Sequence, residues 1–397
     1  MDDMAVAPWP APHRFQRMSA DHAPGQEQSH VAQGLHHVDF SHGDVSAFPP
    51  PPEVVDAVTT ALRDGGRYAY SPYRGHTFIR DLVAQRLGDF TGAPIDPSRE
   101  VIVTPGTQGG LFLALSALVE RGDKVAVVAP DYFANRKIVE YLEATPIPVD
   151  LAYRTADDEP ARLDLDRLRT AFQDGARLLV FSNPNNPTGA IYTADDIEAV
   201  ARLAAEFDAF VVVDQLYSRQ IFDQRPFTHL RAHARERCLT LIGPSKTESV
   251  SGCRVGVAVA PPEIVDRMEQ LQGIVSLRAA GYMQAALEPW LAEAPGWLAQ
   301  RITEHARIRD DLHEVFSAST HLSTRRTEGG SYLFLDVPAA KGRIDDLVRQ
   351  LRTEAAVTVT RGPEFGDFPE SVRLNFSQDH RAAVDAAHRI VDVVARF

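Results

Sequence analysis

The sequence predicts an α/β protein in which helices flank a mostly parallel sheet, with a smaller α+β unit beside it. From Ser71 to about residue 260, short apolar runs alternate with amphipathic helical stretches. The runs are continuous and rich in Val, Ile and Leu, which is typical of strands buried on both faces of a parallel sheet. After about residue 290 this alternation gives way to a long helical stretch and separate strands, which indicates a second unit.

The expected strands of the larger unit are short and end beside turn-forming or polar residues. Because parallel strands present their carboxyl ends at one edge of a sheet, functional groups are expected to cluster there. These strands cover residues 101–104, 124–129, 178–181, 209–213, 239–242 and 256–260. In the smaller unit we expect strands over residues 332–336, 357–360 and 372–376.

The predicted organisation divides the chain into four segments. Residues 1–35 are rich in Pro, His, Gln and Ala without periodicity, which is typical of a mobile N-terminal arm. Residues 36–64 are expected to form the N-terminal part of a small domain whose C-terminal part is 291–397. Residues 65–290 form the large domain, so a cleft is expected between the two domains.

Length and composition argue against several classes of protein. With 397 residues, 44% of them hydrophobic, the chain can bury a large core. A net charge of -13 without a basic run argues against nucleic-acid binding. No apolar run approaches a membrane span and the N-terminus lacks a signal-peptide pattern, so we expect no membrane contact and no export. The two cysteines, Cys238 and Cys253, favour a reducing cytoplasm, and the scattered histidines lack zinc-ligand spacing, so no metal is expected.

Lys246 is the most informative single residue. The strand expected over 239–242 ends at Gly243 and Pro244, and Lys246 follows among small and polar residues at the edge of a core. Burial and a nearby cation such as Arg254 both favour the neutral amine, which is the form that attacks an aldehyde or ketone. A solvated lysine in a surface loop is the alternative from these residues alone.

Two polar groups follow the ends of other expected strands. Asp214 ends an apolar run, with Tyr217 three residues later, and a buried aspartate needs a cationic partner. A protonated pyridine nitrogen suits that role, whereas a helix N-cap is the simpler alternative. Residues 183–189 read NPNNPTG, and Asn, Pro and Gly in such a run are typical of turns. Asparagines fixed between prolines also provide donors for a phenolate-like oxygen.

A glycine turn joins the first expected strand to a helix. Residues 105–110 read PGTQGG, and an amphipathic helix begins at Leu111. A strand, a glycine turn and a helix N-terminus together present backbone N–H groups to an anion, most naturally a phosphate. Arg254 is expected to add a bidentate phosphate contact.

Together these segments resemble the fold-type I pyridoxal-phosphate enzymes and, within them, the class I/II aminotransferase family. The resemblance extends from about Gly43 to Arg373. Its most specific parts are NPNNPTG at 183–189, Asp214 with Tyr217, and Lys246 followed eight residues later by Arg254. It implies pyridoxal 5′-phosphate (PLP) as cofactor and transfer of the amino group of an α-amino acid to a 2-oxo acid.

The resemblance also implies roles for the residues around the cofactor ring. Lys246 matches the lysine that forms the aldimine with the cofactor and later moves the substrate proton. Asp214 matches the partner of the pyridine nitrogen, and Asn186 and Tyr217 match the contacts of the ring hydroxyl. Tyr132 matches the stacking aromatic, although a core aromatic is an equally simple interpretation. The positions that match phosphate contacts are Gly106, Thr107, Gln108, Ser245 and Arg254.

Three further matches concern the substrate and a second subunit. Arg373 matches the arginine that binds the substrate α-carboxylate, although a lone arginine in a strand usually forms a structural ion pair. Gly43 matches a backbone contact near the same carboxylate, which Asn186 also approaches. Tyr70 resembles the tyrosine that reaches the phosphate of the neighbouring subunit, which implies a homodimer with shared active sites.

Departures from the commonest family pattern leave the substrate open. Gln215, Cys253 and Val45 stand where an acidic residue, a large aromatic and a proline are common. Arg278 lies where some members place residues that reach the partner's substrate pocket. It would suit a distal carboxylate, and a surface role or a phosphate-side role is the alternative. The alternatives to an aminotransferase are a lyase, racemase or carbon–carbon bond-forming enzyme on the same scaffold, and a non-catalytic module.

Overall fold

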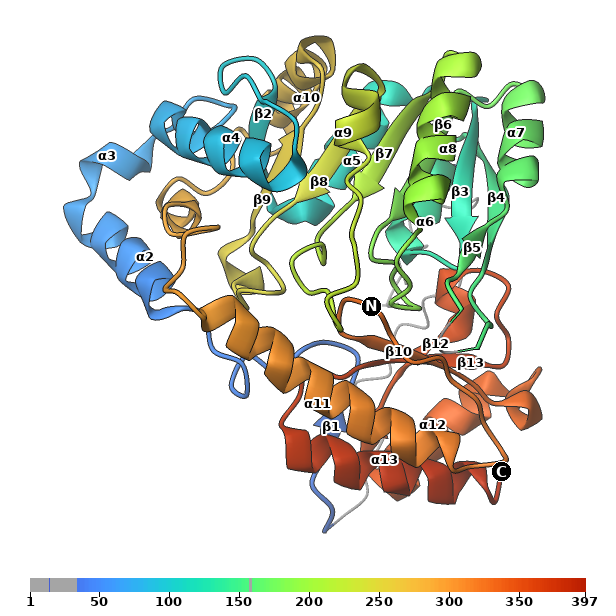
Figure 1. The fold of residues 1–397 in the computed structure, drawn as a ribbon. Coiled ribbons are helices and arrows are strands. Elements are labelled where there is room, and N and C mark those ends of the chain that lie inside the picture. Colours follow the sequence, from blue (N-terminus) through green and yellow to red (C-terminus); the bar gives the residue numbers. More distant parts are fainter. Residues whose placement is uncertain (1–13, 15–33, 157–158) are drawn as a thin grey trace, which may run out of the picture.

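The computed structural model describes residues 14, 34–156 and 159–397. The predicted arm, residues 1–35, lies almost entirely outside the described residues. In the described part, the chain forms a large lobe and a smaller lobe (Figure 1). The long helix α11 (Trp297–Ser317) begins beside the large lobe and runs across the smaller one.

The large lobe is built on a sheet that, within the described residues, has eight strands in the order β2-β9-β8-β7-β6-β3-β4-β5. The strands are β2 (Val101–Pro105), β3 (Lys124–Ala129), β4 (Thr145–Ala152), β5 (Arg162–Leu163), β6 (Leu178–Ser182), β7 (Phe210–Asp214), β8 (Cys238–Ile242) and β9 (Val255–Val259). Neighbours from β4 to β8 pair in parallel. Only β9 and the short β5 run antiparallel to their neighbours. The predicted mostly parallel sheet is therefore confirmed.

Six strands of this sheet coincide with the expected apolar runs to within one residue at each end. Neither β4 nor β5 is predicted from the sequence. β4 contains Pro146 and Pro148, and most of its side chains are partly or fully exposed. It lies near the edge of the sheet, where β5 covers it over only two residues, and proline is tolerated at sheet edges.

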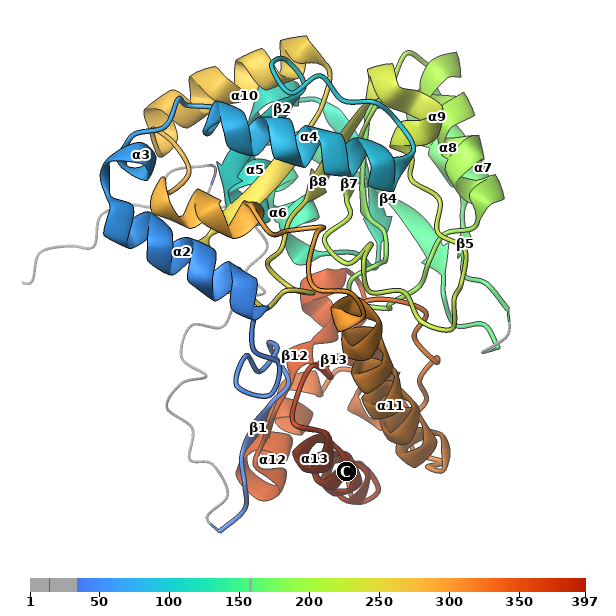
Figure 2. The same ribbon diagram turned by 60° about the vertical axis from the view of Figure 1, so that its left-hand side comes forward.

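Successive side chains of the strands enter two different cores. In β6, Leu178 and Val180 pack on one face of the sheet, whereas Leu179 and Phe181 pack on the other. The first face is covered by α5 (Gly106–Leu118), α6 (Phe133–Tyr141) and α10 (Pro262–Val275). The opposite face is covered by α4 (Thr77–Thr91), α7 (Leu165–Gln173), α8 (Ala194–Glu206) and α9 (Arg231–Ala234) (Figures 1 and 2). Among the described helices, none is long and apolar enough to cross a membrane.

The smaller lobe contains a three-stranded antiparallel sheet in the order β10-β13-β12. Its strands and helices are β10 (Tyr332–Asp336), β12 (Thr360–Arg361), β13 (Ser371–Asn375), α11, α12 (Ile344–Ala355) and α13 (His380–Val394). The strand expected over 357–360 is wrong as one element, because the chain changes partners at Val359. Before it, β11 (Val357–Thr358) pairs with β1 (Val38–Asp39); after it, β12 pairs with β13.

The N-terminal segment 36–64 contacts both lobes. β1 pairs with β11 of the smaller lobe. In contrast, α2 (Pro52–Asp64) lies with α3 (Gly66–Ala69) beside the large lobe (Figure 2). Val54 of α2 belongs to the same core as Ile79 and Trp290. The domain boundaries given above remain a prediction.

Candidate active site

A cavity of about 270 Å³ lies at the carboxyl ends of the central strands of the large sheet. The N-terminus of α5 and the loops that follow β6, β7 and β8 line it. The sequence-predicted residues in its wall are Thr107, Gln108, Tyr132, Asn186, Asp214, Tyr217, Ser245, Lys246 and Arg254. Residues from six separate segments of the chain therefore meet where the parallel-sheet topology predicts a site.

The turn before α5 forms a close contact with Arg254. Gly106 has φ +74°, and a Cβ atom there would lie 2.4 Å from Nη2 of Arg254. A Cβ atom on Gly256 would lie 2.4 Å from the backbone nitrogen of Thr107. Positions 106 and 256 therefore both require glycine, because a side chain at either would collide with its neighbour. The helix N-terminus and a guanidinium group lie together, which suits a phosphate.

Asp214 lies at the end of β7 and faces the cavity. One of its carboxylate oxygens accepts a hydrogen bond from the backbone N–H of Leu216 at 3.0 Å. Burial raises the pKa of Asp214 to about 6, against the lowering effects of that N–H group and of Lys246. Among the described residues no lysine or arginine forms an ion pair with it. This carboxylate therefore suits a cationic ligand group in the cavity.

Two tyrosines frame the cavity through hydroxyl contacts. The hydroxyl of Tyr132 donates to Oε1 of Gln108 at 2.8 Å. The hydroxyls of Tyr217 and Tyr332 lie 2.6 Å apart. Burial, with Tyr332 beside it, raises the pKa of Tyr217 well above its usual value, so this hydroxyl stays protonated and able to donate.

Arg373 extends from β13 of the smaller lobe toward the same site. Its Nη1 donates to the side-chain oxygen of Asn186 at 3.0 Å, and its Nη2 donates to the carbonyl of Ser41 at 2.9 Å. The guanidinium group lies between the rings of Tyr332 and Phe365, 4.4 Å and 4.9 Å from their centroids. Its Nε is buried and has no hydrogen-bond partner among the described residues, which leaves a donor for a carboxylate ligand.

A second cavity of about 120 Å³ adjoins the first, and Lys246 lines both. Gly43 lies in the wall of this second cavity, as do Asn375 and Ser377. Of the predicted substrate contacts, Asn186 lines the first cavity and Gly43 lines the second. Arg373 lines neither cavity and is linked to the first through its hydrogen bond to Asn186.

The structure does not bring Tyr70 to this site. Its side chain is 84% exposed, and the guanidinium carbon of Arg278 lies 5.6 Å from its ring centroid. Within one chain, Tyr70 therefore contributes nothing to either cavity. A role for Tyr70 at a phosphate requires a second copy of the chain.

Tyr332 is a site residue that is not predicted from the sequence. Although burial raises the pKa of its hydroxyl, the positive charges of Arg373 and Lys246 outweigh that effect and lower it below the usual value. In the sequence, Tyr332 begins an apolar strand and resembles an ordinary core residue. The only local signal is the glycine pair Gly329 and Gly330: a Cβ atom on Gly329 would lie 2.8 Å from Pro184, and Gly330 has φ +75°.

Asp131 is a second residue that is not predicted. It is buried, and Tyr132, Ser182, Asn185 and Asn135 all donate to its carboxylate. Burial raises the pKa of Asp131 to about 8, although the donors from Ser182 and the Tyr132 amide lower it. Asp131 thereby ties the turn that carries Tyr132 to the end of β6.

These observations fit the cofactor implied by the sequence resemblance. In the described part of the chain, Asp214 forms no ion pair with a lysine or arginine, and the turn at Gly106 lies against Arg254. A protonated pyridine and a phosphate group require these two features. Asn186 and Tyr217 lie in the wall between them, beside Lys246. These residues would hold PLP by its ring nitrogen, its ring hydroxyl and its phosphate.

The chain is similar to known proteins over most of its length. The family described as "Aminotransferase class I and II" matches residues 36–390. The chain is 29% identical to the aspartate/prephenate aminotransferase of Thermus thermophilus over 367 residues, which cover 92% of each chain. The crystal structure of an aspartate aminotransferase from Rhodobacter sphaeroides is 50% identical, covering 97% of this chain and 98% of that one, with a TM-score of 0.91. An aromatic aminotransferase structure from Pyrococcus horikoshii is 25% identical over 91% of this chain and 96% of that one, with a TM-score of 0.82.

Proposed function

Because this chain belongs to the class I and II aminotransferase family and is a PLP-dependent aminotransferase, we propose that its amino donor is an acidic amino acid of the aspartate type. The observation that carries this proposal is the 50% identity, over 97% of the chain, to a protein described as an aspartate aminotransferase. The other outcomes considered from the sequence, namely lyase, racemase and carbon–carbon bond-forming chemistry, find no support among the relatives named above.

The proposed mechanism assigns one task to each group of residues. Bound PLP supplies an aldehyde for the substrate amine and a ring that accepts the electrons released at the α-carbon. Asp214 keeps the ring nitrogen protonated, because a buried carboxylate without a cation is costly. Arg373 binds the α-carboxylate through its fork of donors, one of which is buried and unpaired. With PLP bound, the amine of Lys246, which lines both cavities, would take the α-proton of the amino acid and deliver it to the carbon that was the cofactor's aldehyde.

An acidic substrate carries a second carboxylate, which needs a cation of its own. Among the described residues that line the two cavities, Lys246 and Arg254 are the only lysine or arginine side chains. Arg254 is assigned to the phosphate, and Arg373 beside the cavities is assigned to the α-carboxylate. We therefore propose that the distal carboxylate is bound by an arginine of a second copy of the chain.

Arg278 is the arginine best placed on the surface for this task. It stacks on Tyr70 and also lies 5.9 Å from the ring centroid of Tyr73. The chain just before it exposes apolar side chains, with Ile274 82% and Val275 60% exposed. An exposed apolar surface of this kind is typical of a protein–protein interface. We propose that this surface forms the homodimer and brings Tyr70 and Arg278 into the partner's active site.

The dimer proposal predicts complementation between two defective chains. Tyr70→Ala is expected to bind PLP about tenfold more weakly, because a hydrogen bond to a charged group contributes roughly 1.5–3 kcal/mol. Lys246→Ala is expected to be inactive. In a heterodimer purified through two different tags, one site has Lys246 from one chain and Tyr70 from the other. At limiting PLP, this heterodimer should have about half the activity of the wild-type dimer.

The two homodimeric variants, measured at the same limiting PLP concentration, serve as controls for the heterodimer. A heterodimer no more active than the mean of these variants would show that Tyr70 does not act across the interface. A monomer in light scattering at assay concentration would overturn the dimer itself.

The substrate proposal is tested by a spectral screen of amino acids against the holoenzyme. L-Aspartate and L-glutamate should react with the bound cofactor faster than L-alanine and L-phenylalanine at equal concentration. Arg278→Met should reduce kcat/KM for the two acidic substrates by about tenfold or more, because an ion-paired hydrogen bond is lost, and should leave L-alanine nearly unaffected. Fastest reaction with L-phenylalanine would refute the substrate class while leaving the aminotransferase activity intact.

A further inference from the structure

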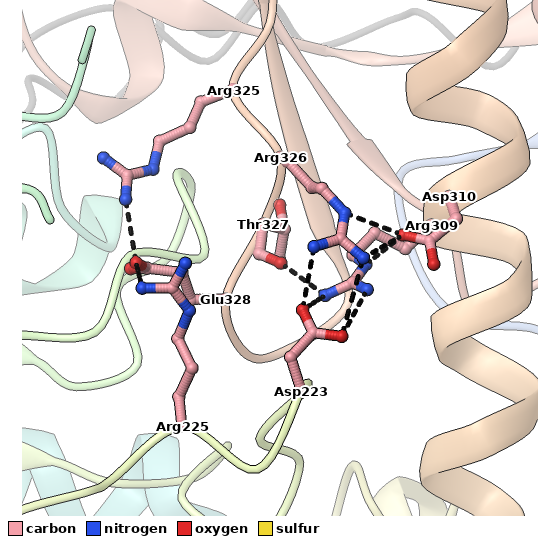
Figure 3. Close-up of polar contacts among 8 residues, drawn as sticks. All are labelled: Asp223, Arg225, Arg309, Asp310, Arg325, Arg326, Thr327 and Glu328. Carbon is pink, nitrogen blue, oxygen red and sulfur yellow. Dashed lines mark hydrogen bonds and ion pairs between the residues drawn. The ribbon is translucent and has the colours of Figure 1, made fainter. Parts of the chain in front are cut away.

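Glu328 belongs to the smaller lobe and contacts two loops of the large lobe, one after β6 and one after β7. Figure 3 shows its carboxylate between the guanidinium groups of Arg225 and Arg325. Both arginines contact the same carboxylate oxygen at 2.8 Å. The side chain of Glu328 is almost fully buried, with 2% relative exposure of the residue. The carboxylate is therefore held by contacts from two arginines.

The remaining contacts of Glu328 are to loops that carry site residues. Its second carboxylate oxygen accepts a hydrogen bond from the backbone N–H of Ile191 at 2.9 Å. Its own backbone N–H donates to the carbonyl of Gly189 at 3.1 Å, and its carbonyl accepts from Phe222 at 2.9 Å. Gly189 and Ile191 follow Asn186 in the chain, and Phe222 follows Tyr217. Glu328 itself precedes Tyr332 by four residues.

These segments also pack closely against one another at two glycines, Gly189 and Gly329. A Cβ atom on Gly189 would lie 2.3 Å from a methyl group of Thr327 and 2.8 Å from the carbonyl oxygen of Gly329. A Cβ atom on Gly329 would lie 2.8 Å from Pro184. Because real Cβ atoms do not approach this closely, a shift of either segment displaces the other. A displacement of the segment that contains Glu328 therefore also displaces the loop at 183–189.

We propose that Glu328 is a positioning residue that fixes Asn186, Tyr217 and Tyr332 relative to one another. The three segments it joins carry the predicted contacts of the ring hydroxyl and of the substrate-binding Arg373. With a neutral side chain at position 328, the two arginines lose their shared anion, and the amide of Ile191 loses a charged acceptor. This inference rests on the roles proposed above for Asn186 and Tyr217.

A neighbouring cluster in the same view provides a matched control. Asp310 of α11 is a carboxylate paired with two arginines, Arg309 at 2.8 Å and Arg326 at 3.0 Å (Figure 3). Among the described residues, the carboxylate of Asp310 contacts Arg309 and Arg326 and forms no hydrogen bond to the loops that carry Asn186 or Tyr217. Asp310→Asn therefore removes the same charge from the same lobe junction while leaving the site loops in place.

The test compares the wild-type holoenzyme with Glu328→Gln and Asp310→Asn. In Glu328→Gln, hydrogen–deuterium exchange of the segment containing Ile191 should be at least about tenfold faster, because a charge-assisted hydrogen bond is lost. The pH midpoint of the visible band of the bound cofactor should rise, since donors at the ring hydroxyl become misplaced. kcat/KM should fall by about 10-fold to 100-fold, as is usual when an outer partner of a binding residue is lost.

Asp310→Asn should change neither the exchange of this segment nor the pH midpoint. If Glu328→Gln does not fold, Arg225→Gln, which removes one partner from the same carboxylate oxygen, should produce smaller changes of the same sign. Equal exchange rates and equal pH midpoints in all variants would overturn the inference. A wild-type protein without a visible cofactor band would instead overturn the proposed site, so the two failures are distinguishable.

Discussion

Replacement of Lys246 by alanine is expected to abolish both turnover and the visible absorption band of the lysine-linked cofactor. Lys246 follows β8, and among the described residues that line both cavities it is the only one with an amine. Because the same amine is proposed to bind the cofactor and to move the α-proton, no other side chain replaces it. We expect kcat to fall by at least about four orders of magnitude, the scale seen when a residue of a catalytic unit is removed.

A surface lysine provides the control for this experiment. Lys341 is exposed, lies 3.8 Å from Glu370 in the smaller lobe and lines neither cavity. Lys341→Ala should keep the absorption band and the wild-type kcat. If Lys246→Ala, with a native circular dichroism spectrum, keeps the band and more than a few per cent of the activity, the assignment of Lys246 is wrong.

Replacement of Asp214 by asparagine is expected to have opposite effects on activity and on the stability of the cofactor-free protein. Activity should fall by about a thousandfold, the upper range for loss of one preorganised electrostatic contact. The asparagine cannot stabilise a protonated ring nitrogen, so the ring accepts electrons less readily. Asp208, an exposed residue just before β7 that pairs with Arg237 at 2.6 Å, is the matched control, and Asp208→Asn should remain active.

The stability effect follows from the sign of the pKa shift. Burial raises the pKa of Asp214 from 3.8 to about 6, so the folded cofactor-free protein disfavours the ionised form. The free energy of unfolding of the cofactor-free protein therefore falls by up to roughly 3 kcal/mol as pH rises from about 4 to about 6. Above pH 6, cofactor-free Asp214→Asn should unfold at a higher urea concentration than the cofactor-free wild type. Equal urea midpoints at pH 5 and pH 8 in the wild type would contradict this reasoning.

Much of the large lobe is predictable from the sequence because its strands are continuous apolar runs. The exceptions have local causes: β4 contains Pro146 and Pro148, and the run at 357–360 is divided between two pairing partners at Val359. The sequence of a partly exposed strand near a sheet edge has no continuous apolar run, and a change of pairing partner does not alter the apolar pattern of a strand. These features depend on neighbours that are distant in the chain.

For the candidate site, too, residues that a local pattern reveals differ from residues that depend on contacts with distant parts of the chain. Residues that follow strand ends, such as Lys246 and Asp214, are predictable because the topology alone gathers them at one edge of the sheet. Tyr332 meets Tyr217 across 115 residues, and Glu328 meets Ile191 across 137 residues. Their importance comes from contacts between lobes, which no local pattern in the sequence records. For Tyr70 the sequence predicts a role at a second subunit, whereas in the single chain this residue is exposed.

The most direct test of amino-group transfer at Lys246 is a half-reaction with a defined stoichiometry. Wild-type holoenzyme is mixed with L-aspartate in the absence of any 2-oxo acid, and the products are quantified. We predict one equivalent of the corresponding 2-oxo acid per active site, with loss of the visible band and its return when 2-oxoglutarate is added. Release of carbon dioxide or free ammonia, or recovery of racemised aspartate with an unchanged band, would contradict the transfer of an amino group at this site.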